Sequence, residues 1–233
     1  FSKNLQQVGF SSQTKSVLTT LKEAVDNSLD ACEEAGILPE ISVNIEKLGA
    51  GSMKNADKIR VKVVDNGPGI PVEVIPQVFG EYLASSKFGR GRCSRGQQGI
   101  GISAATTWAQ LTNAQGAIVI SKTEDMRKAV KAIVEVDIKN NKGVLKNRES
   151  IDWDRKHGVS AEFVIDGRIQ LNGEGGLLNY LNGCTLVNPH MTLHYTLPEA
   201  KKVTVERVTD TMPEIPDATE PHPHPMKLGE FIA

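Results

Sequence analysis

The sequence predicts a two-layer α/β (α+β) sandwich in which a mixed sheet is covered by helices on one face. Two kinds of segment recur along the 233-residue chain: stretches with the 3.6-residue apolar period of a helix, and shorter stretches in which every second residue is apolar. Hydrophobic residues make up 39% and charged residues 24% of the chain, a composition that can bury a core. Such helices and strands bury their apolar faces by packing in layers.

The first helix is expected over residues 16–35, after a polar segment that we interpret as an arm. Gly36 and Pro39 follow the helix, and both are typical stop signals. At about 100° per residue, one side of the helix carries Leu18, Leu21, Val25, Ser28 and Cys32.

Two strands are expected next, at residues 41–48 and 58–65, because apolar and polar residues alternate in both. The segment between them is a turn region, so the two strands are expected to form a hairpin. Residues 72–83 have a helical pattern that contains Pro76, which predicts a kinked helix or two short pieces.

The remaining chain begins with a glycine-rich, cationic loop at about residues 84–101. Helices are expected in "ISAATTWAQLTN" and, for a short stretch, in "GGLLNYLNG". Strands are expected in "GAIVISKT", "AVKAIVEVDIK", "VSAEFVID", "MTLHYTLP" and "KKVTVERV". Residues 211–233 are rich in proline and are expected to be a linker.

Charge and cysteine content limit the possible environments of the protein. The formal net charge is −1, so a DNA contact would require a local patch or a partner chain. Cys32, Cys93 and Cys184 are widely spaced, which favours a reducing compartment, and no apolar run predicts a membrane span. We therefore expect a cytoplasmic protein, and we interpret the chain, which begins at Phe1, as a piece of a longer one.

Three polar residues lie opposite the apolar side of the first helix. Glu23 and Asn27 are four residues apart and Asn27 and Asp30 are three apart, so they are neighbours on the helix surface. Two carboxylates and an amide oxygen can hold a hard cation or orient a water molecule. A solvated polar face is the alternative interpretation, and it is the usual meaning of such a pattern.

The motif "VVDNGPGI" places Asp65 at the end of a strand and directly before a glycine-rich turn. A carboxylate there can accept a hydrogen bond from an exocyclic amine such as that of adenine. Gly67 and Gly69 have no Cβ, so the backbone can approach a flat ring closely. An ordinary turn is the alternative, because Asn-Gly and Pro-Gly are common turn dipeptides.

The motif "SRGQQGIGISAA" leads through Gly96, Gly99 and Gly101 into a helix. Glycines let successive N–H groups point into one concavity, and a helix N-terminus adds positive potential, so this motif predicts a phosphate site. A dinucleotide-binding fold is not indicated, because a cationic loop and not a strand precedes the glycines. The chain also has no "GxxxxGK[ST]" motif, which excludes the P-loop NTPases.

In this order, "EAVDNSLDA", "DNGPGI" and "RGQQGIGISAA" resemble the three nucleotide-binding boxes of the GHKL ATPases, which include gyrase B, Hsp90, the MutL proteins and histidine kinases. Within that superfamily, "KEAVDNSLDACEEAGILPEI" and "SRGQQGIGISAA" resemble the B subunits of archaeal-type DNA topoisomerase VI, a type IIB enzyme. The resemblance covers nearly the whole chain. It implies a Bergerat-type ATPase fold that uses ATP and Mg²⁺.

The resemblance also implies roles for individual residues. Glu23 would be the general base that orients the attacking water, and Asn27 would ligate Mg²⁺ and contact ATP. Asp65 would bind the adenine amine, with Gly69 beneath the base. Ser86 and Lys87 would lie at the base of an ATP lid formed by residues 84–101. The phosphates would be wrapped by Gln97, Gln98, Gly99, Ile100, Gly101, Ile102 and Ser103.

One position departs from the family pattern, in which a Gly-Thr pair on a later strand helps to form the adenine pocket. Here Gly158 is kept and Val159 replaces the threonine, while Ser160 is expected to point to the other side of the strand. The family also completes its active site with a lysine from a later domain. We therefore expect this chain to hydrolyse ATP weakly by itself.

The implied function is that of the ATP-hydrolysing B subunit of a type IIB topoisomerase. ATP would bring two B subunits together, and an A subunit that cleaves double-stranded DNA would complete an A2B2 assembly without a membrane. The expected domains are an arm over residues 1–15, the ATPase domain over 16–210 and the linker over 211–233 toward a helical domain. The alternatives are another GHKL ATPase and a nucleotide-binding scaffold that does not hydrolyse ATP.

Overall fold

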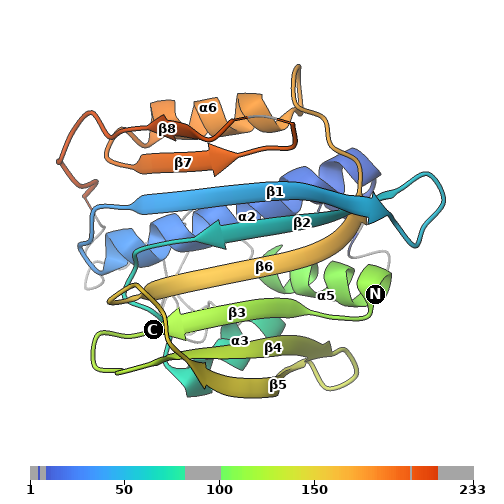
Figure 1. The fold of residues 1–233 in the computed structure, drawn as a ribbon, viewed down its shortest axis with the longest axis horizontal. Helices are drawn as coiled ribbons and strands as arrows, with labels where there is room; N and C mark the ends of the chain where they lie inside the picture. Colours follow the sequence, from blue (N-terminus) through green and yellow to red (C-terminus); the bar gives the residue numbers. More distant parts are fainter. Residues whose placement is uncertain (1–4, 6–8, 82–100, 200, 215–233) are drawn as a thin grey trace, which may run out of the picture.

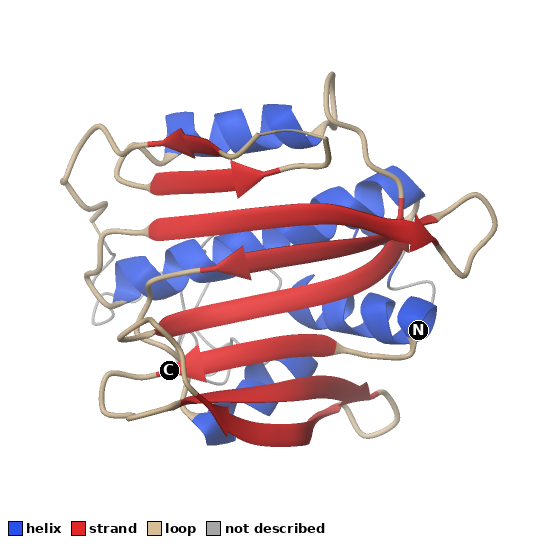
Figure 2. Ribbon diagram, viewed as in Figure 1, coloured by secondary structure: helices blue, strands red, loops and turns tan. Residues whose placement is uncertain are grey.

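An eight-stranded sheet runs through the molecule with its helices on one face, as Figures 1 and 2 show. This computed structural model describes residues 5, 9–81, 101–199 and 201–214. The strands are β1 (Glu40–Ala50), β2 (Asp57–Val64), β3 (Ala117–Lys122), β4 (Ala129–Asp137), β5 (Lys142–Ile151), β6 (Gly158–Gly167), β7 (Thr192–Thr196) and β8 (Val203–Val205). The helices are α2 (Gln13–Glu34), η2 (Val72–Val74), α3 (Ile75–Gly80), α5 (Gly101–Asn113) and α6 (Leu177–Val187).

The sheet is mixed, as predicted. Its strand order is β5-β4-β3-β6-β2-β1-β7-β8. Strand β1 pairs with β2 in the predicted antiparallel hairpin and with β7 in parallel, and the other strand pairs are antiparallel. The predicted two-layer fold class is confirmed, and the break at Pro76 gives the two short pieces η2 and α3.

Helix α2 begins at Gln13, three residues earlier than predicted. The Ser12 hydroxyl caps it by accepting a 3.1 Å hydrogen bond from the Lys15 N–H. The predicted start was wrong because the first turn of the helix has few apolar residues and so adds nothing to the apolar period. The helix starts there because the cap supplies a hydrogen-bond acceptor to a backbone N–H group of that turn. The described residues that precede the helix also pack on the domain, since Leu5 and Phe10 are buried.

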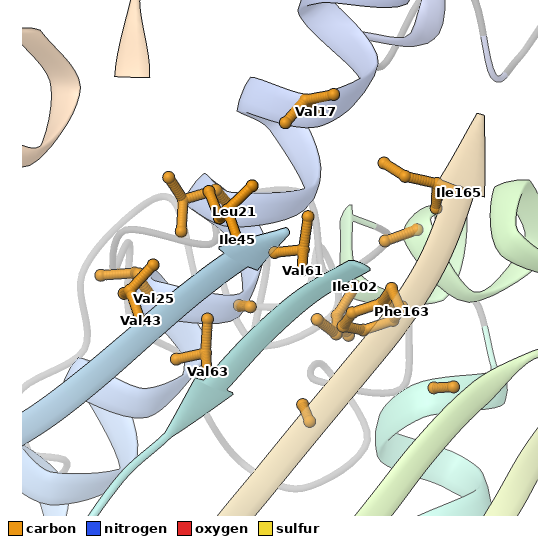
Figure 3. Close-up of a cluster of buried hydrophobic side chains, with 14 of the residues drawn as sticks. Val17, Leu21, Val25, Val43, Ile45, Val61, Val63, Ile102, Phe163 and Ile165 are labelled. Carbon is orange, nitrogen blue, oxygen red and sulfur yellow. The ribbon is translucent and has the colours of Figure 1, made fainter. Parts of the chain in front are cut away.

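The core lies between the helices and the sheet. The labelled part of it in Figure 3 is built from side chains of α2, of the three adjacent strands β1, β2 and β6, and of α5. Ten of them are labelled there: Val17, Leu21, Val25, Val43, Ile45, Val61, Val63, Ile102, Phe163 and Ile165. This packing fixes α2 across β2 and β6, so the polar residues of α2 are held at one position over the sheet.

Strand β5 was not among the predicted strands. It lies at the edge of the sheet, pairs only with β4 among the described strands, and exposes most of its residues, including Lys142, Lys146 and Arg148. In its first half, Gly143 passes against the Pro76 backbone of α3 and Leu145 packs on the core, whereas residues 146–150 are exposed. So few packed apolar side chains give little of the alternation of a half-buried strand, and charged side chains protect the free edge. The apolar period therefore carried no signal for it.

One buried carboxylate, Asp166 on β6, has a structural role far from the predicted motifs. Its Oδ2 accepts hydrogen bonds from the Ser52 hydroxyl (2.8 Å) and the Met53 N–H (2.7 Å), and its Oδ1 accepts one from Asn113 Nδ2 (3.2 Å). These contacts tie the β1–β2 turn and the end of α5 to β6. Within the described ranges, none of the helices has the length and apolar character needed to cross a bilayer.

Candidate functional site

A cavity lies where the second half of α2 meets the turn after β2, the start of α5 and strand β6. Its apolar walls include Ala24, Ile70, Val78, Phe79, Val159 and Ala161. Its polar groups include Asn27, Ser28 and Asp65. Together with α3, which contributes Val78 and Phe79, these segments form a pocket with apolar walls and a few polar groups, the usual composition of a small-molecule site.

Asp65 lies just beyond the end of β2, and its side chain is held by three hydrogen-bond donors. The Ser28 hydroxyl donates to Oδ2 at 2.7 Å, while the N–H groups of Gly67 and Val159 donate to Oδ1 at 2.9 and 3.1 Å. A carboxylate has about four lone-pair positions. The contacts of the described residues therefore leave room for a further donor, and the cavity is where Asp65 meets solvent or a ligand.

Burial raises the pKa of the Asp65 carboxyl, although the hydrogen bonds from Ser28, Gly67 and Val159 favour its charged form. Only 3% of the residue is exposed. A carboxylate in such a place gains from one more donor, because its charge is poorly solvated. An exocyclic amine in the cavity would supply that donor.

The turn that follows Asp65 is fastened on two further sides. The Asn66 carboxamide oxygen accepts from the Glu40 N–H at 2.8 Å, and its Nδ2 donates to the Leu38 carbonyl at 3.0 Å. The buried Ser121 hydroxyl of β3 accepts from the Ile70 N–H and donates to the Ile70 carbonyl, both at 2.7 Å. These contacts make the turn a rigid wall of the cavity.

Gly69 lines the cavity, and the fold itself also requires glycine at this position. Its φ is +80°, and a Cβ there would lie 2.1 Å from the carbonyl oxygen of Lys122 on β3. The residue therefore needs glycine because the turn passes directly against a strand end. The predicted position beneath a bound base remains a prediction.

Glu23 lies one helical turn before Asn27, against the first residue of α5. A Cβ added to Gly101 would lie 2.0 Å from Glu23 Cδ, so the carboxylate packs directly on the Gly101 backbone. Burial raises the pKa of Glu23, the Lys22 cation lowers it, and the Asp30 carboxylate raises it further. A half-buried carboxylate with a raised pKa beside a helix N-terminus suits a general base.

Asn27 is half-buried and lines the cavity next to this carboxylate. Among the described residues, no group of three or more His, Cys, Asp or Glu side chains could hold a metal ion. A single amide oxygen in a cavity fits Mg²⁺ that takes its remaining ligands from phosphate and water. Asn27 could hold such an ion, and its role as a Mg²⁺ ligand stays a prediction.

The structure brings together Asn27, Asp65, Gly69 and Ile102 around the cavity and sets Glu23 and Gly101 at its side. Ser103 is fully buried in α5. The predicted residues Ser86, Lys87, Gln97, Gln98, Gly99 and Ile100 lie outside the described residues.

Two residues of the site were missed in the sequence. Ser28 was assigned to the apolar side of α2, and Asn66 was given no role, yet both make hydrogen bonds that shape the cavity. Asparagine in a tight turn is a usable signal for Asn66, because its side chain often bonds nearby backbone. Nothing in the sequence distinguished Ser28 from a small core residue.

Val159 replaces the threonine of the family pattern, but another residue brings a hydroxyl to Asp65. Val159 and Ala161 line the cavity, as alternate residues of a strand do, so Ser160 between them lies on the opposite face, as expected. The Val159 backbone still donates to Asp65, and the hydroxyl that Asp65 contacts comes from Ser28 on α2. A hydroxyl donor is thus present at the carboxylate despite the valine.

Comparison with known proteins decides the family. Residues 13–140, more than half of the chain, match the family of histidine kinase-, DNA gyrase B- and HSP90-like ATPases. The chain belongs to this ATPase family. Its motifs on α2, after β2 and at the start of α5 are the ones that line the cavity.

Several relatives within this ATPase family are similar over the full chain. The B subunit of type 2 DNA topoisomerase 6 from Archaeoglobus fulgidus is 41% identical over 233 residues, which are 100% of this chain and 38% of that protein. Its counterpart from Methanococcoides burtonii is 43% identical over 232 residues, which are 100% of this chain and 36% of that protein. The B subunit from Pyrococcus furiosus is 39% identical over 224 residues, which are 96% of this chain and 38% of that protein. The chain thus spans less than two-fifths of the length of these relatives.

Two solved structures share the fold of this chain at low sequence identity. The ATPase region of Saccharomyces cerevisiae topoisomerase II bound to ICRF-187 has a TM-score of 0.52 and 11% identity, covering 80% of this chain and 48% of that one. The N-terminal domain of a DNA repair protein has a TM-score of 0.51 and 16% identity, covering 88% and 55%. At such identities the likeness concerns the fold alone.

Proposed function

We propose that the protein is the ATP-binding and ATP-hydrolysing B subunit of a type IIB DNA topoisomerase. The observation that carries this proposal is the buried Asp65 carboxylate, which three donors hold at the wall of an apolar cavity. Such a group selects a base with an exocyclic amine. Similarity to topoisomerase 6 B subunits over the full chain supports the choice among the ATPases of this family.

At the base end of the cavity, Asp65 accepts the adenine amine while apolar side chains cover the ring faces. Val159 and Ala161 on β6 and Ile70 in the turn supply this apolar surface. A guanine presents an acceptor where adenine presents its amine, so the Asp65 carboxylate would repel it. The pocket therefore favours ATP over GTP.

At the phosphate end, Glu23 orients a water molecule for attack on the terminal phosphate and accepts its proton. Asn27 holds Mg²⁺, which supplies charge neutralisation of the phosphates when bound. Residues 97–103, with Ser86 and Lys87, bind the phosphate oxygens through N–H groups and cationic charge. The raised pKa of Glu23 makes its carboxylate a stronger base than a solvated glutamate, which suits a group that accepts a proton from water.

In the complete assembly, ATP binding brings two B subunits together and thereby gates the passage of one DNA duplex through another. The A subunit cleaves double-stranded DNA in an A2B2 complex, and supercoils relax. Residues 1–15 act as an arm, residues 16–210 as the ATPase domain and residues 211–233 as the link to the next domain. The complex works on DNA in the cytoplasm.

The direct test is calorimetric titration of the chain with Mg²⁺ and a non-hydrolysable ATP analogue. We expect saturable binding to the wild type, loss of binding in Asp65→Asn, and retained binding in Glu23→Gln. Absence of binding at millimolar nucleotide would overturn the proposal. In the longer protein with its A subunit, Glu23→Gln should abolish ATP-dependent relaxation, and unchanged relaxation would exclude Glu23 as the base.

A further inference from the structure

The loop between β5 and β6, residues 152–157, touches the turn that holds Asp65. An Arg155 guanidinium N–H donates to the Asp65 carbonyl at 3.2 Å, and His157 Nδ1 lies 2.6 Å from the Gly67 carbonyl oxygen. Both contacts join residues 90 positions apart in the sequence. Both partners on the turn are backbone atoms, so the contacts set where the turn lies.

The donor in the His157 contact follows from its chemistry. A carbonyl oxygen only accepts, so the Nδ1 atom carries the proton and donates it to Gly67. This holds for the neutral ring with its proton on Nδ1 and for the imidazolium. The 2.6 Å separation is short for an N–H···O hydrogen bond, so the ring lies directly against the Gly67 carbonyl oxygen.

Gly67 connects this loop to the Asp65 carboxylate. Its carbonyl accepts from His157, while its own N–H donates to Asp65 Oδ1 at 2.9 Å. One residue therefore links the imidazole to the group that would accept the base amine. Two residues later along the chain from His157, the Val159 N–H donates to the same Oδ1 atom.

The loop is itself held in place. Lys122 Nζ at the end of β3 donates to the Arg155 carbonyl at 3.1 Å, and the Arg155 guanidinium lies 5.9 Å from the centre of the Trp153 ring. Gly158 then passes so close to the turn that a Cβ there would lie 2.2 Å from the Asp65 carbonyl oxygen. Within the described part of the chain, residues 152–157 contribute nothing to the cavity lining.

We propose that His157 is a positioning residue for nucleobase recognition. It acts through Gly67 to hold the Asp65 carboxylate in the orientation that accepts a hydrogen bond from the base. This inference rests on the function proposed above. It assigns control of adenine affinity to a side chain outside the pocket, because a carboxylate that shifts by a few tenths of an ångström loses hydrogen-bond alignment.

The test compares variants that keep or remove a donor at the Nδ1 position. Asn places its amide N–H near the position of the histidine Nδ1, whereas the Gln amide reaches the Nε2 position and Leu has no donor. We expect His157→Leu and His157→Gln to weaken binding of Mg²⁺ and a non-hydrolysable ATP analogue about fivefold, the size of one lost hydrogen bond. His157→Asn should stay within about twofold of the wild type.

Lys156→Ala is the matched control, because Lys156 is exposed in the same loop. It should bind like the wild type. Urea denaturation of each variant separates folding from binding, and the comparison of His157→Asn with His157→Gln remains decisive if His157→Leu does not fold. A structural role alone would not make Asn restore affinity while Gln does not.

The outcomes separate this inference from the proposed function. Failure of the wild type to bind the analogue overturns both. Binding by the wild type, its loss in Asp65→Asn and equal affinities across the His157 variants overturn only the role of His157. Equal weakening by Asn and Gln also overturns it, because ring packing and not the donated proton would then matter.

Discussion

The Ser28 hydroxyl donates a 2.7 Å hydrogen bond to Asp65 Oδ2, joining two residues that are 37 positions apart. Ser28 lies on α2 and Asp65 follows β2, so the bond spans the two layers of the domain at the cavity. It links the helix that carries Glu23 and Asn27 to the carboxylate at the base end. A change at either residue should therefore alter both stability and nucleotide affinity.

Replacing Ser28 by alanine removes this donor from a buried carboxylate. Ser28→Ala should lower the free energy of unfolding by about 1–2 kcal/mol and weaken binding of the ATP analogue about fivefold. Loss of the bond also raises the pKa of Asp65 further, since the bond favours its charged form. Urea denaturation and calorimetry measure the two effects.

Ser16→Ala on the same helix serves as the control. The Ser16 hydroxyl donates to the Ser12 carbonyl at 2.7 Å near the start of α2, away from the cavity. That variant should lose some stability and keep its nucleotide affinity. Equal loss of affinity in both variants would show that helix stability, not the contact with Asp65, sets binding.

Replacing Asp65 by asparagine should abolish nucleotide binding and yet stabilise the empty fold. The amide oxygen can still accept from Gly67 and Val159, and the amide N–H₂ can donate to the Ser28 hydroxyl. No charge is then buried. We expect Asp65→Asn to raise the free energy of unfolding at pH 7 by an amount on the order of 1 kcal/mol.

The stability difference between Asp65→Asn and the wild type should depend on pH in one direction. Burial raises the pKa of Asp65 in the folded chain above its unfolded value, so its stabilising contribution is complete below the unfolded pKa and is lost as pH rises through the folded pKa. The variant lacks this titration. The stability advantage of Asp65→Asn in urea denaturation should therefore grow as the pH rises above about 4, the ordinary pKa of an aspartate, and an advantage that shrinks with rising pH would contradict the burial of the charge.

Gly101 faces the Glu23 carboxylate so closely that alanine would force that carboxylate to move. Gly101→Ala should lower the free energy of unfolding by up to about 1 kcal/mol, because the Cβ would lie 2.0 Å from Glu23 Cδ and the flexible end of the Glu23 side chain must shift. In a Glu23→Ala background the same change should be nearly neutral. A double-mutant cycle by urea denaturation measures this coupling.

Gly183→Ala is the control for that cycle. Gly183 lies within α6, and a Cβ there meets nothing within 4 Å, so alanine should raise stability by up to about 1 kcal/mol. Its effect should be independent of Glu23. Equal effects of Gly101→Ala in both backgrounds would mean that the two residues do not touch.

Gly69 and Gly36 share a positive φ but differ in their surroundings. Gly36 has φ +69° and open space where a Cβ would be, so Gly36→Ala should cost about 1–2 kcal/mol of stability. At Gly69, with φ +80°, the Cβ would also meet the Lys122 carbonyl at 2.1 Å, so Gly69→Ala should cost at least about 3 kcal/mol. Thermal unfolding of both variants separates the strain of the backbone from the clash, and similar losses would refute the close approach.

Most of the fold was predictable because half-buried elements leave a period in the sequence. The β1–β2 hairpin, the break at Pro76 and the helix after the glycine motif were all predicted from alternation or helical spacing. Strand β5 was not, since most of its residues are exposed and few apolar side chains on it face the helix layer. The start of α2 was misplaced because a cap is a local hydrogen bond and not a periodic feature.

For the site, local spacing marked Glu23, Asn27 and Asp65 as candidates, and the resemblance of three motifs to the ATPase family assigned their roles, which stay predictions. The partners of these residues were not predictable. Ser28 meets Asp65, Gly101 meets Glu23, and His157 meets Gly67 only because the sheet and its helix layer bring distant segments together.

The sequence by itself determined the ATPase family and the candidate residues of its site, since the motifs are continuous and a few neighbouring side chains define each. The tertiary structure alone decided how those groups are held. The sequence does not distinguish a serine that packs in a core from Ser28, which donates to Asp65. It also does not distinguish a solvated loop histidine from His157, which contacts Gly67. The physical reason is that hydrogen bonds act over about 3 Å in space, whatever the separation along the chain.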